Sequence, residues 1–183
     1  QAAINAVPSG GGVVYFPAGK YKISNVLTIN NSQNCIVLEG CGADPGVNDE
    51  GSILWQADGT DTEFIKINGA DSITIRNLLF RGGTFFDSGS DDKGTTGGMG
   101  GITAIRNNTG GSGHVFENLR FIGVTNSISL YGVGQCCLNN IIIAHVPVTN
   151  AGVSIRLEQY TLDGTVYRID QIRIDGIIID GSP

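Results

Sequence analysis

The 183-residue chain is poor in several residue types, and each shortage narrows the class of protein. Only 15% of residues are charged, 40% are hydrophobic and just 5 are proline, which is typical of a folded, core-forming domain. Apolar runs stay far below the length of a membrane span, so we expect no membrane insertion. Lys and Arg do not cluster and the formal net charge is −6, which argues against nucleic acid as a partner. We expect one domain over residues 1–183.

Cysteine is scarce and has no metal-binding spacing. The chain lacks a C-x-x-C pair, which argues against a zinc site built on cysteine. Two of the four cysteines are adjacent, and neighbouring residues of a strand point to opposite faces. We therefore predict reduced cysteines that mostly serve packing, with no disulfide framework, at positions Cys35, Cys41, Cys136 and Cys137.

Glycine, at 28 residues, is abundant, and short alternating apolar stretches recur between the glycines. One unit appears in four variants, over residues 73–82, 114–123, 136–145 and 167–176. Each has a strand pattern, then an amide residue, then a second strand pattern; the amides are Asn77, Asn118, Asn140 and Gln171. Recurrence of one unit with variable spacing is typical of stacked coils whose length differences lie in loops. We predict that these four amides form a single file in the interior.

Further strand patterns precede these units, at residues 52–57, 64–69, 101–107, 127–132 and 153–158. About six coils fit the length. Residues 1–7 have a helical pattern that places Ala3, Ile4 and Val7 on one side, and a Pro/Gly-rich stretch then ends it. We predict a capping helix within residues 1–10, and a long loop excursion over residues 83–100. The sequence thus predicts an all-β stack of parallel strands with a helix at its N-terminal end.

The opening QAAINAVPSGGGVVYFPAGKYKIS (residues 1–24) and the segment LEGCG (residues 38–42) resemble the pectate-lyase-like superfamily of right-handed parallel β-helix proteins. The repeated amide units resemble that superfamily's coils. The resemblance covers nearly the whole chain and implies a right-handed, single-stranded parallel β-helix. Members include phage tailspikes, secreted polysaccharide lyases and hydrolases, and non-catalytic virion or envelope proteins. The resemblance also implies an extracellular or virion-surface location and a homo-oligomer, commonly a trimer among tailspikes.

Candidate site residues follow from aligning the first strand of each coil. Alternation then predicts two outward rows, the first with Lys66, Ala104, Ser129 and Arg156, and the second with Asn68, Arg106, Tyr131 and Glu158. Superfamily members bind extended sugar chains along this face. We expect Lys66, Asn68 and Arg156 to bind substrate. Lys66 and Arg156 are cations that can neutralise acidic sugars through charge-assisted bonds.

Three residues of the second row are the candidate catalytic group. Arg106 could polarise a carbonyl, Tyr131 could donate a proton, and Glu158 could act as a base. A hydrolase instead needs two carboxylates about 5 to 9.5 Å apart, and Glu158 has no neighbour of that kind in the predicted rows. The competing interpretation is a solvated surface whose opposite charges pair across strands.

No cofactor is expected, with calcium as the alternative. Two acidic loops offer oxygen ligands, Asp58, Asp61 and Glu63 in one and Asp87, Asp91 and Asp92 in the other. Neither loop matches the twelve-residue calcium pattern, and acids among Gly and Ser commonly serve solubility.

Three functions remain open at this point. The first is a carbohydrate-directed module like a tailspike, which recognises and could cleave a cell-surface polysaccharide. The second is a secreted polysaccharide lyase or glycoside hydrolase acting on acidic glycans, and the third is a non-catalytic architectural β-helix. Because the chain stops just after an apolar strand pattern, we also expect a fragment of a longer polypeptide or an end that a partner covers.

Overall fold

The computed structural model describes residues 1–42, 51–56, 63–82, 103–144 and 154–180, and it is all-β with parallel sheets and a short N-terminal helix. Helix α1 spans Ala2–Asn5. The strands are β1 (Gly12–Phe16), β2 (Gly19–Lys22), β3 (Leu27–Asn30), β4 (Ile36–Gly40), β5 (Ser52–Gln56), β6 (Ile65–Asn68), β7 (Thr74–Gly82), β8 (Thr103–Asn107), β9 (Ser112–Ile122), β10 (Asn126–Tyr131), β11 (Gly134–Ala144), β12 (Ile155–Glu158), β13 (Tyr160–Leu162), β14 (Thr165–Tyr167) and β15 (Asp170–Asp180). The predicted loop excursion at 83–100 lies outside the described residues.

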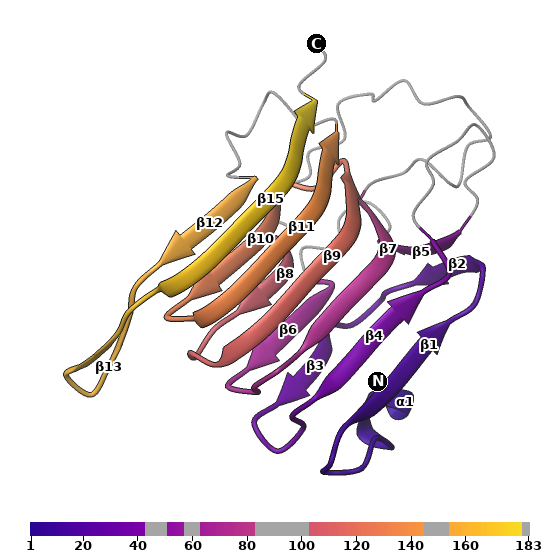
Figure 1. Cartoon of the computed structure of the whole chain (residues 1–183). Helices are drawn as coiled ribbons and strands as arrows, with labels where there is room; N and C mark the ends of the chain where they lie inside the picture. The colour runs from indigo at the N-terminus through magenta and orange to yellow at the C-terminus, as the bar shows by residue number, and fades with distance from the viewer. Residues whose placement is uncertain (43–50, 57–62, 83–102, 145–153, 181–183) are drawn as a thin grey trace.

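Two parallel sheets contain most of the strands (Figure 1). Sheet A is eight-stranded and follows the order β1-β4-β7-β9-β11-β15, with β2 and β5 joined to its side. Sheet B is five-stranded and follows the order β12-β10-β8-β6-β3. From β6 to β12 the chain alternates between the two sheets, so strands that pair are separated in sequence by a visit to the other sheet. Strands β13 and β14 form a separate antiparallel pair.

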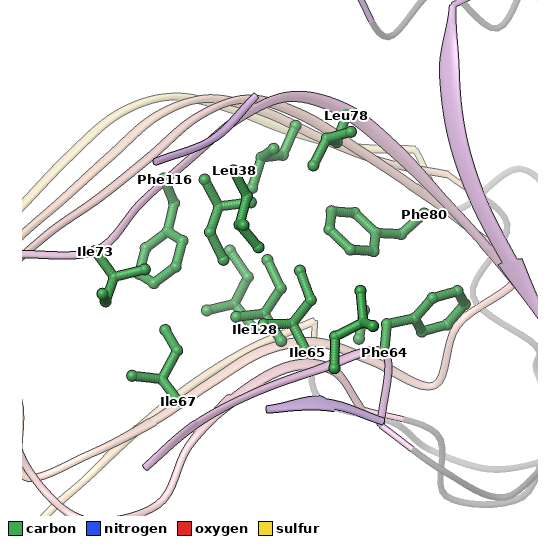
Figure 2. Close-up of a cluster of buried hydrophobic side chains, with 14 of the residues drawn as sticks. Leu38, Phe64, Ile65, Ile67, Ile73, Leu78, Phe80, Phe116 and Ile128 are labelled. Carbon is green, nitrogen blue, oxygen red and sulfur yellow. The ribbon is translucent and has the colours of Figure 1, made fainter. Parts of the chain in front are cut away.

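The core lies between the two sheets. On the middle strands of the two sheets, inward-pointing residues are fully buried, for example Ile65 and Ile67 on β6, and Leu38 on β4 (Figure 2). Phenylalanines extend this packing, since the rings of Phe80 and Phe121 stack with centroids 5.1 Å apart. Stacking in register places like residues above one another, which is why a single alternating pattern can build every layer of the core.

A column of left-handed residues crosses sheet A. Asn77, Asn118 and Asn140 have φ of 59°, 50° and 50°, and each places two consecutive residues outside the core. Their amides bond in series, with Asn118 Nδ2 3.0 Å from Asn77 Oδ1 and Asn140 Nδ2 2.9 Å from Asn118 Oδ1. The predicted file is therefore confirmed for these three. Its predicted interior position is wrong, because the left-handed backbone turns the amides to the surface, where they are half-buried or exposed.

Gln171 belongs to a different column. In the register of β11 with β15 it lies beside Gln135, whose Nε2 is 3.1 Å from Gln171 Oε1, and Gly176 takes the place next to Asn140. The prediction that Gln171 extends the Asn file is wrong, because a positive φ in the next strand is supplied by a glycine. The second column lies at the start of the sheet A strands, before β1, β4 and β7 and at the second residue of β9, β11 and β15. All its members have positive φ: Gly11, Cys35, Ser72, Gly113, Gln135 and Gln171.

Helix α1 closes the N-terminal end, as predicted, but it is shorter than residues 1–7. Ile4 is buried in the core and Val7 packs against it, whereas Ala3 is exposed, contrary to the predicted inward face. The Gln1 side chain bonds the backbone of Thr28 on β3 twice, at 2.8 Å and 3.0 Å. It occupies the free edge of sheet B in the way a further strand would.

The four cysteines are free thiols, and Cys136 and Cys137 point to opposite faces, as predicted. Cys136 is buried, and burial raises its pKa to about 12. Cys35 and Cys41 are exposed, so the predicted packing role is wrong for these two.

Among the described residues, no helix is long and apolar enough to cross a membrane.

Candidate functional site

The outer face of sheet B contains the predicted site residues, but in a different register. Lys66 lies beside Arg106, Arg106 beside Ser129, and Ser129 beside Arg156. In the second row, Tyr131 lies beside Glu158. Arg106 therefore belongs to the first row with Lys66 and Arg156, and the prediction that placed it in register with Tyr131 is wrong by two residues.

A buried polar residue causes this error. Asn107 occupies the inward position between Ile67 and Leu130, where an apolar residue was expected, and its exposed fraction is 0%. Ile105 had been aligned with those two residues, but it lies one inward position earlier, beside Ile65 and Ile128. Ala104, predicted to point outward in the row of Lys66, is fully buried.

Asn107 is accommodated in the core because its polar atoms have partners. Its Nδ2 donates to the Gly110 carbonyl at 2.7 Å, and its Oδ1 accepts from the Thr109 amide at 3.2 Å. Its Nδ2 also lies 3.2 Å from Nε2 of His114 on β9, which is itself buried. A buried amide without such partners would cost about 1–3 kcal/mol. Sequence reasoning missed this pair, and the signal was an Asn at an inward position followed by a Gly-rich turn.

Tyr131 contacts two of the predicted cations, Arg106 and Arg156. The Arg106 guanidinium lies over the Tyr131 ring, 5.5 Å from its centroid, on the diagonal between neighbouring strands. Arg156, on the other side, hydrogen-bonds to Tyr131 and has its Nε 3.5 Å from Glu158 Oε1. The bond to Tyr131 and the charge of Glu158 raise the pKa of Arg156 above its ordinary value. A half-buried aromatic ring thus lies between two guanidinium groups.

Glu63 is a further member of this surface that the sequence did not place there. Its Oε1 is 2.9 Å from Arg106 Nη1, and it precedes β6 by two residues. The sequence analysis had grouped Glu63 with Asp58 and Asp61 as possible calcium ligands in an acidic loop. Asp58 and Asp61 lie outside the described residues.

Glu63 and Glu158 do not form a pair of catalytic acids. Strand β6, which follows Glu63, is three strand spacings from β12, or about 14 Å. The two residues also lie toward opposite ends of their strands, with Glu158 the last residue of β12. This separation exceeds the roughly 5 to 9.5 Å that glycoside hydrolysis by two carboxylates requires.

Lys66 and Asn68 extend the surface on β6. Lys66 is half-buried beside Arg106, and Asn68 is exposed next to Asn30 of β3. The structure therefore brings Lys66, Arg106, Tyr131, Arg156 and Glu158 onto one face, with Asn68 at its margin. We call this set, with Glu63, the sheet B surface. Ser129, predicted to lie outward in the first row, is only 3% exposed between Arg106 and Arg156, so its predicted exposure is wrong.

The described residues contain no group of three or more His, Cys, Asp and Glu side chains that could hold a metal ion. The predicted calcium ligands Asp87, Asp91 and Asp92 lie outside the part of the chain that is described.

Comparison with protein-family models, with curated proteins and with solved structures found no match for this chain.

Proposed function

We propose that this chain is a carbohydrate-directed module, resembling a tailspike of the pectate-lyase-like superfamily, whose sheet B surface binds an extended polysaccharide outside the cell or on a virion. The proposal includes the fold, with the two sheets as faces of a right-handed parallel β-helix. Three features support that fold: in-register parallel strands, alternation of the chain between sheets, and the repeated left-handed positions. The trimer remains a prediction from the resemblance.

The observation that carries the proposal is the position of Tyr131 between Arg106 and Arg156 on a half-exposed strand face. An aromatic ring offers an apolar surface to the face of a sugar, and guanidinium groups bind carboxylates with two parallel hydrogen bonds. Lys66 lies in the same row as Arg106 and Arg156, so positive charge extends across the strands. A long chain with repeated acidic groups, lying across the strands, would meet several of these cations at once.

Recognition is better supported than hydrolysis, because Glu63 and Glu158 are too far apart to act as a pair. Cleavage by elimination would need a base and a cation near one sugar carbon, and Glu158, Tyr131 and Arg156 are the residues that could supply them. We therefore include elimination as the enzymatic form of the proposal.

A titration with an acidic oligosaccharide tests binding. We expect oligogalacturonate to bind the wild-type chain at neutral pH more tightly than a neutral glucan of equal length. Tyr131→Ala should weaken binding by about tenfold, equivalent to about 1.4 kcal/mol, because the stacking surface and the contact with Arg106 are lost. Tyr15→Ala is the matched control, since Tyr15 is an exposed tyrosine on β1 of the other sheet.

The same samples distinguish the outcomes. New absorbance from unsaturated sugar ends would show elimination, and new reducing ends without that absorbance would show hydrolysis. Binding without turnover would leave a recognition module. Equal affinity of wild type, Tyr131→Ala and Tyr15→Ala for every sugar would overturn the assignment of this surface.

An architectural role is the second candidate, and one observation favours it. Both arginines of the sheet B surface already have carboxylate partners, Arg106 with Glu63 and Arg156 with Glu158. Ion pairs on a half-exposed face also occur on protein surfaces that have no binding role. Absence of binding to both charged and neutral glycans would favour this role.

A further inference from the structure

Two N–H groups converge on the buried imidazole of His114. The backbone N–H of Ile73, at the start of β7, is 3.3 Å from Nδ1. The side-chain Nδ2 of Asn107, on β8, is 3.2 Å from Nε2. His114 therefore joins β7 and β9 of sheet A to β8 of sheet B through polar contacts inside the core.

The orientation of the Asn107 amide is fixed by its other partners. Nδ2 donates to the Gly110 carbonyl, and Oδ1 accepts from the Thr109 N–H. Turning the amide over would set oxygen against oxygen and two N–H donors against each other. A hydrogen of Nδ2 thus points at His114 Nε2.

A neutral imidazole has one acceptor nitrogen for these two donors, and an imidazolium has none. Protonation would place N–H groups against both Ile73 and Asn107, around a ring that is only 1% exposed. Two titratable groups bear on His114 in the described part of the chain: Asp71, whose charge favours the imidazolium, and Cys136, its register partner on β11. Burial outweighs Asp71 and lowers the pKa of His114 to about 4, and the Cys136 thiol stays neutral.

Asn107 directly follows Arg106 on β8, so the contact with His114 holds the strand that presents Arg106 on the outer face. We propose that His114 is an acid-sensitive tie between the two sheets: protonation of the imidazole removes its one acceptor nitrogen, sets N–H groups against both Ile73 and Asn107, and loosens β8. The tie itself depends only on the fold. We also expect weaker polysaccharide binding in acid, and that expectation rests on the proposed function.

Amide hydrogen exchange followed by NMR, together with the titration of the His114 ring, tests the tie between pH 7 and pH 3.5. We expect the protection factors of the β8 amides to fall at least tenfold as the ring takes up its proton, while those of β4 stay constant. His114→Gln keeps an acceptor oxygen without a titrating ring, and its β8 protection should not depend on pH. Asp71→Asn removes the charge that favours the imidazolium, so the β8 change should move to lower pH.

Three results would overturn the proposal: a His114 ring that becomes protonated with β8 protection unchanged, equal loosening of β4 and β8 in the wild type, or the same β8 loosening in His114→Gln. The comparison of β8 with β4 within the wild type keeps the test decisive if a variant fails to fold. Absence of glycan binding at pH 7 would count against the proposed function and leave this proposal untouched.

Discussion

The two ends of the stack differ in how their apolar edges are covered. At the N-terminal end, Ile4 of α1 is only 1% exposed, and Gln1 bonds the free edge of β3. At the other end, β15 has β11 on one side and no strand on its other side among the described residues. Ile174 and Ile179 are 50% and 58% exposed there.

This difference shows that burial depends on the neighbouring layer as well as on the sequence pattern. Ile143 and Ile179 are the same residue type in the same register position on adjacent strands, yet Ile143 is fully buried. A layer is buried only when a further layer or a cap lies against it. The hydrophobic contribution of each layer is therefore shared with its neighbours.

Truncating the two isoleucines should give the largest contrast. Ile143→Ala should lower the free energy of unfolding by about 2–5 kcal/mol, because it leaves a cavity in a closed core. Ile179→Ala removes the same atoms from a half-exposed site and should cost about 1 kcal/mol or less. Urea unfolding of both variants measures the difference. Equal losses would contradict the contrast between middle and end.

Acid should sharpen the comparison, because it affects the middle of the stack. The folded-state pKa of His114, about 4, lies below the unfolded value of about 6.5, so the unfolded chain binds the extra proton between these values. The free energy of unfolding should therefore fall by up to about 3 kcal/mol as the pH drops from 6.5 to 4. Urea titrations at several pH values, with His114→Gln as control, measure it. A pH dependence that persists fully in His114→Gln would assign the effect to other groups.

Removing the edge contact of Gln1 should have a smaller effect. Gln1→Ala deletes two side-chain hydrogen bonds to Thr28 and should cost about 1–2 kcal/mol. Gln171→Ala, toward the open end, deletes the single contact with Gln135 and should cost less. Thermal unfolding of the two variants decides the order. A larger loss for Gln171→Ala would show that the Gln1 contact does not seal the edge.

Introducing a charged residue on β15 should have the smallest effect on the free energy of unfolding. Ile178 is 55% exposed, so Ile178→Lys should change the free energy of unfolding by no more than about 0.5 kcal/mol. A charged residue on a free edge should also reduce association of the chain with itself. Sedimentation at increasing concentration measures association, and a large destabilisation would show that Ile178 is covered.

The sequence allowed the all-β class, most of the parallel strands, the N-terminal helix and the turn asparagines to be predicted, because each depends on local alternation or on a residue that tolerates positive φ. The antiparallel pair β13–β14 was not predicted. The register of β8 could not be predicted, because the inward Asn107 contacts His114 of β9, which only the fold brings near. Apolar alternation favoured Ile105 at that position instead.

The candidate site was predictable in composition and less so in arrangement. Tyr131, Arg156 and Glu158 lie in the predicted relation, because β10 and β12 have plain alternating patterns. Arg106 still contacts Tyr131 despite its shifted register, since a long side chain reaches the diagonal neighbour. Glu63 was not predictable, because its partner depends on the direction that the Arg106 side chain takes.

Parallel strands in this register set Arg106 and Arg156 on either side of Tyr131. Backbone NOEs across β6, β8, β10 and β12 are the measurement that tests this arrangement. We expect NOEs that link Arg106 to its register partners Lys66 and Ser129, and Tyr131 to Glu158. Strong Hα–Hα contacts typical of antiparallel strands, or a β8 register that sets Arg106 directly opposite Tyr131, would contradict it.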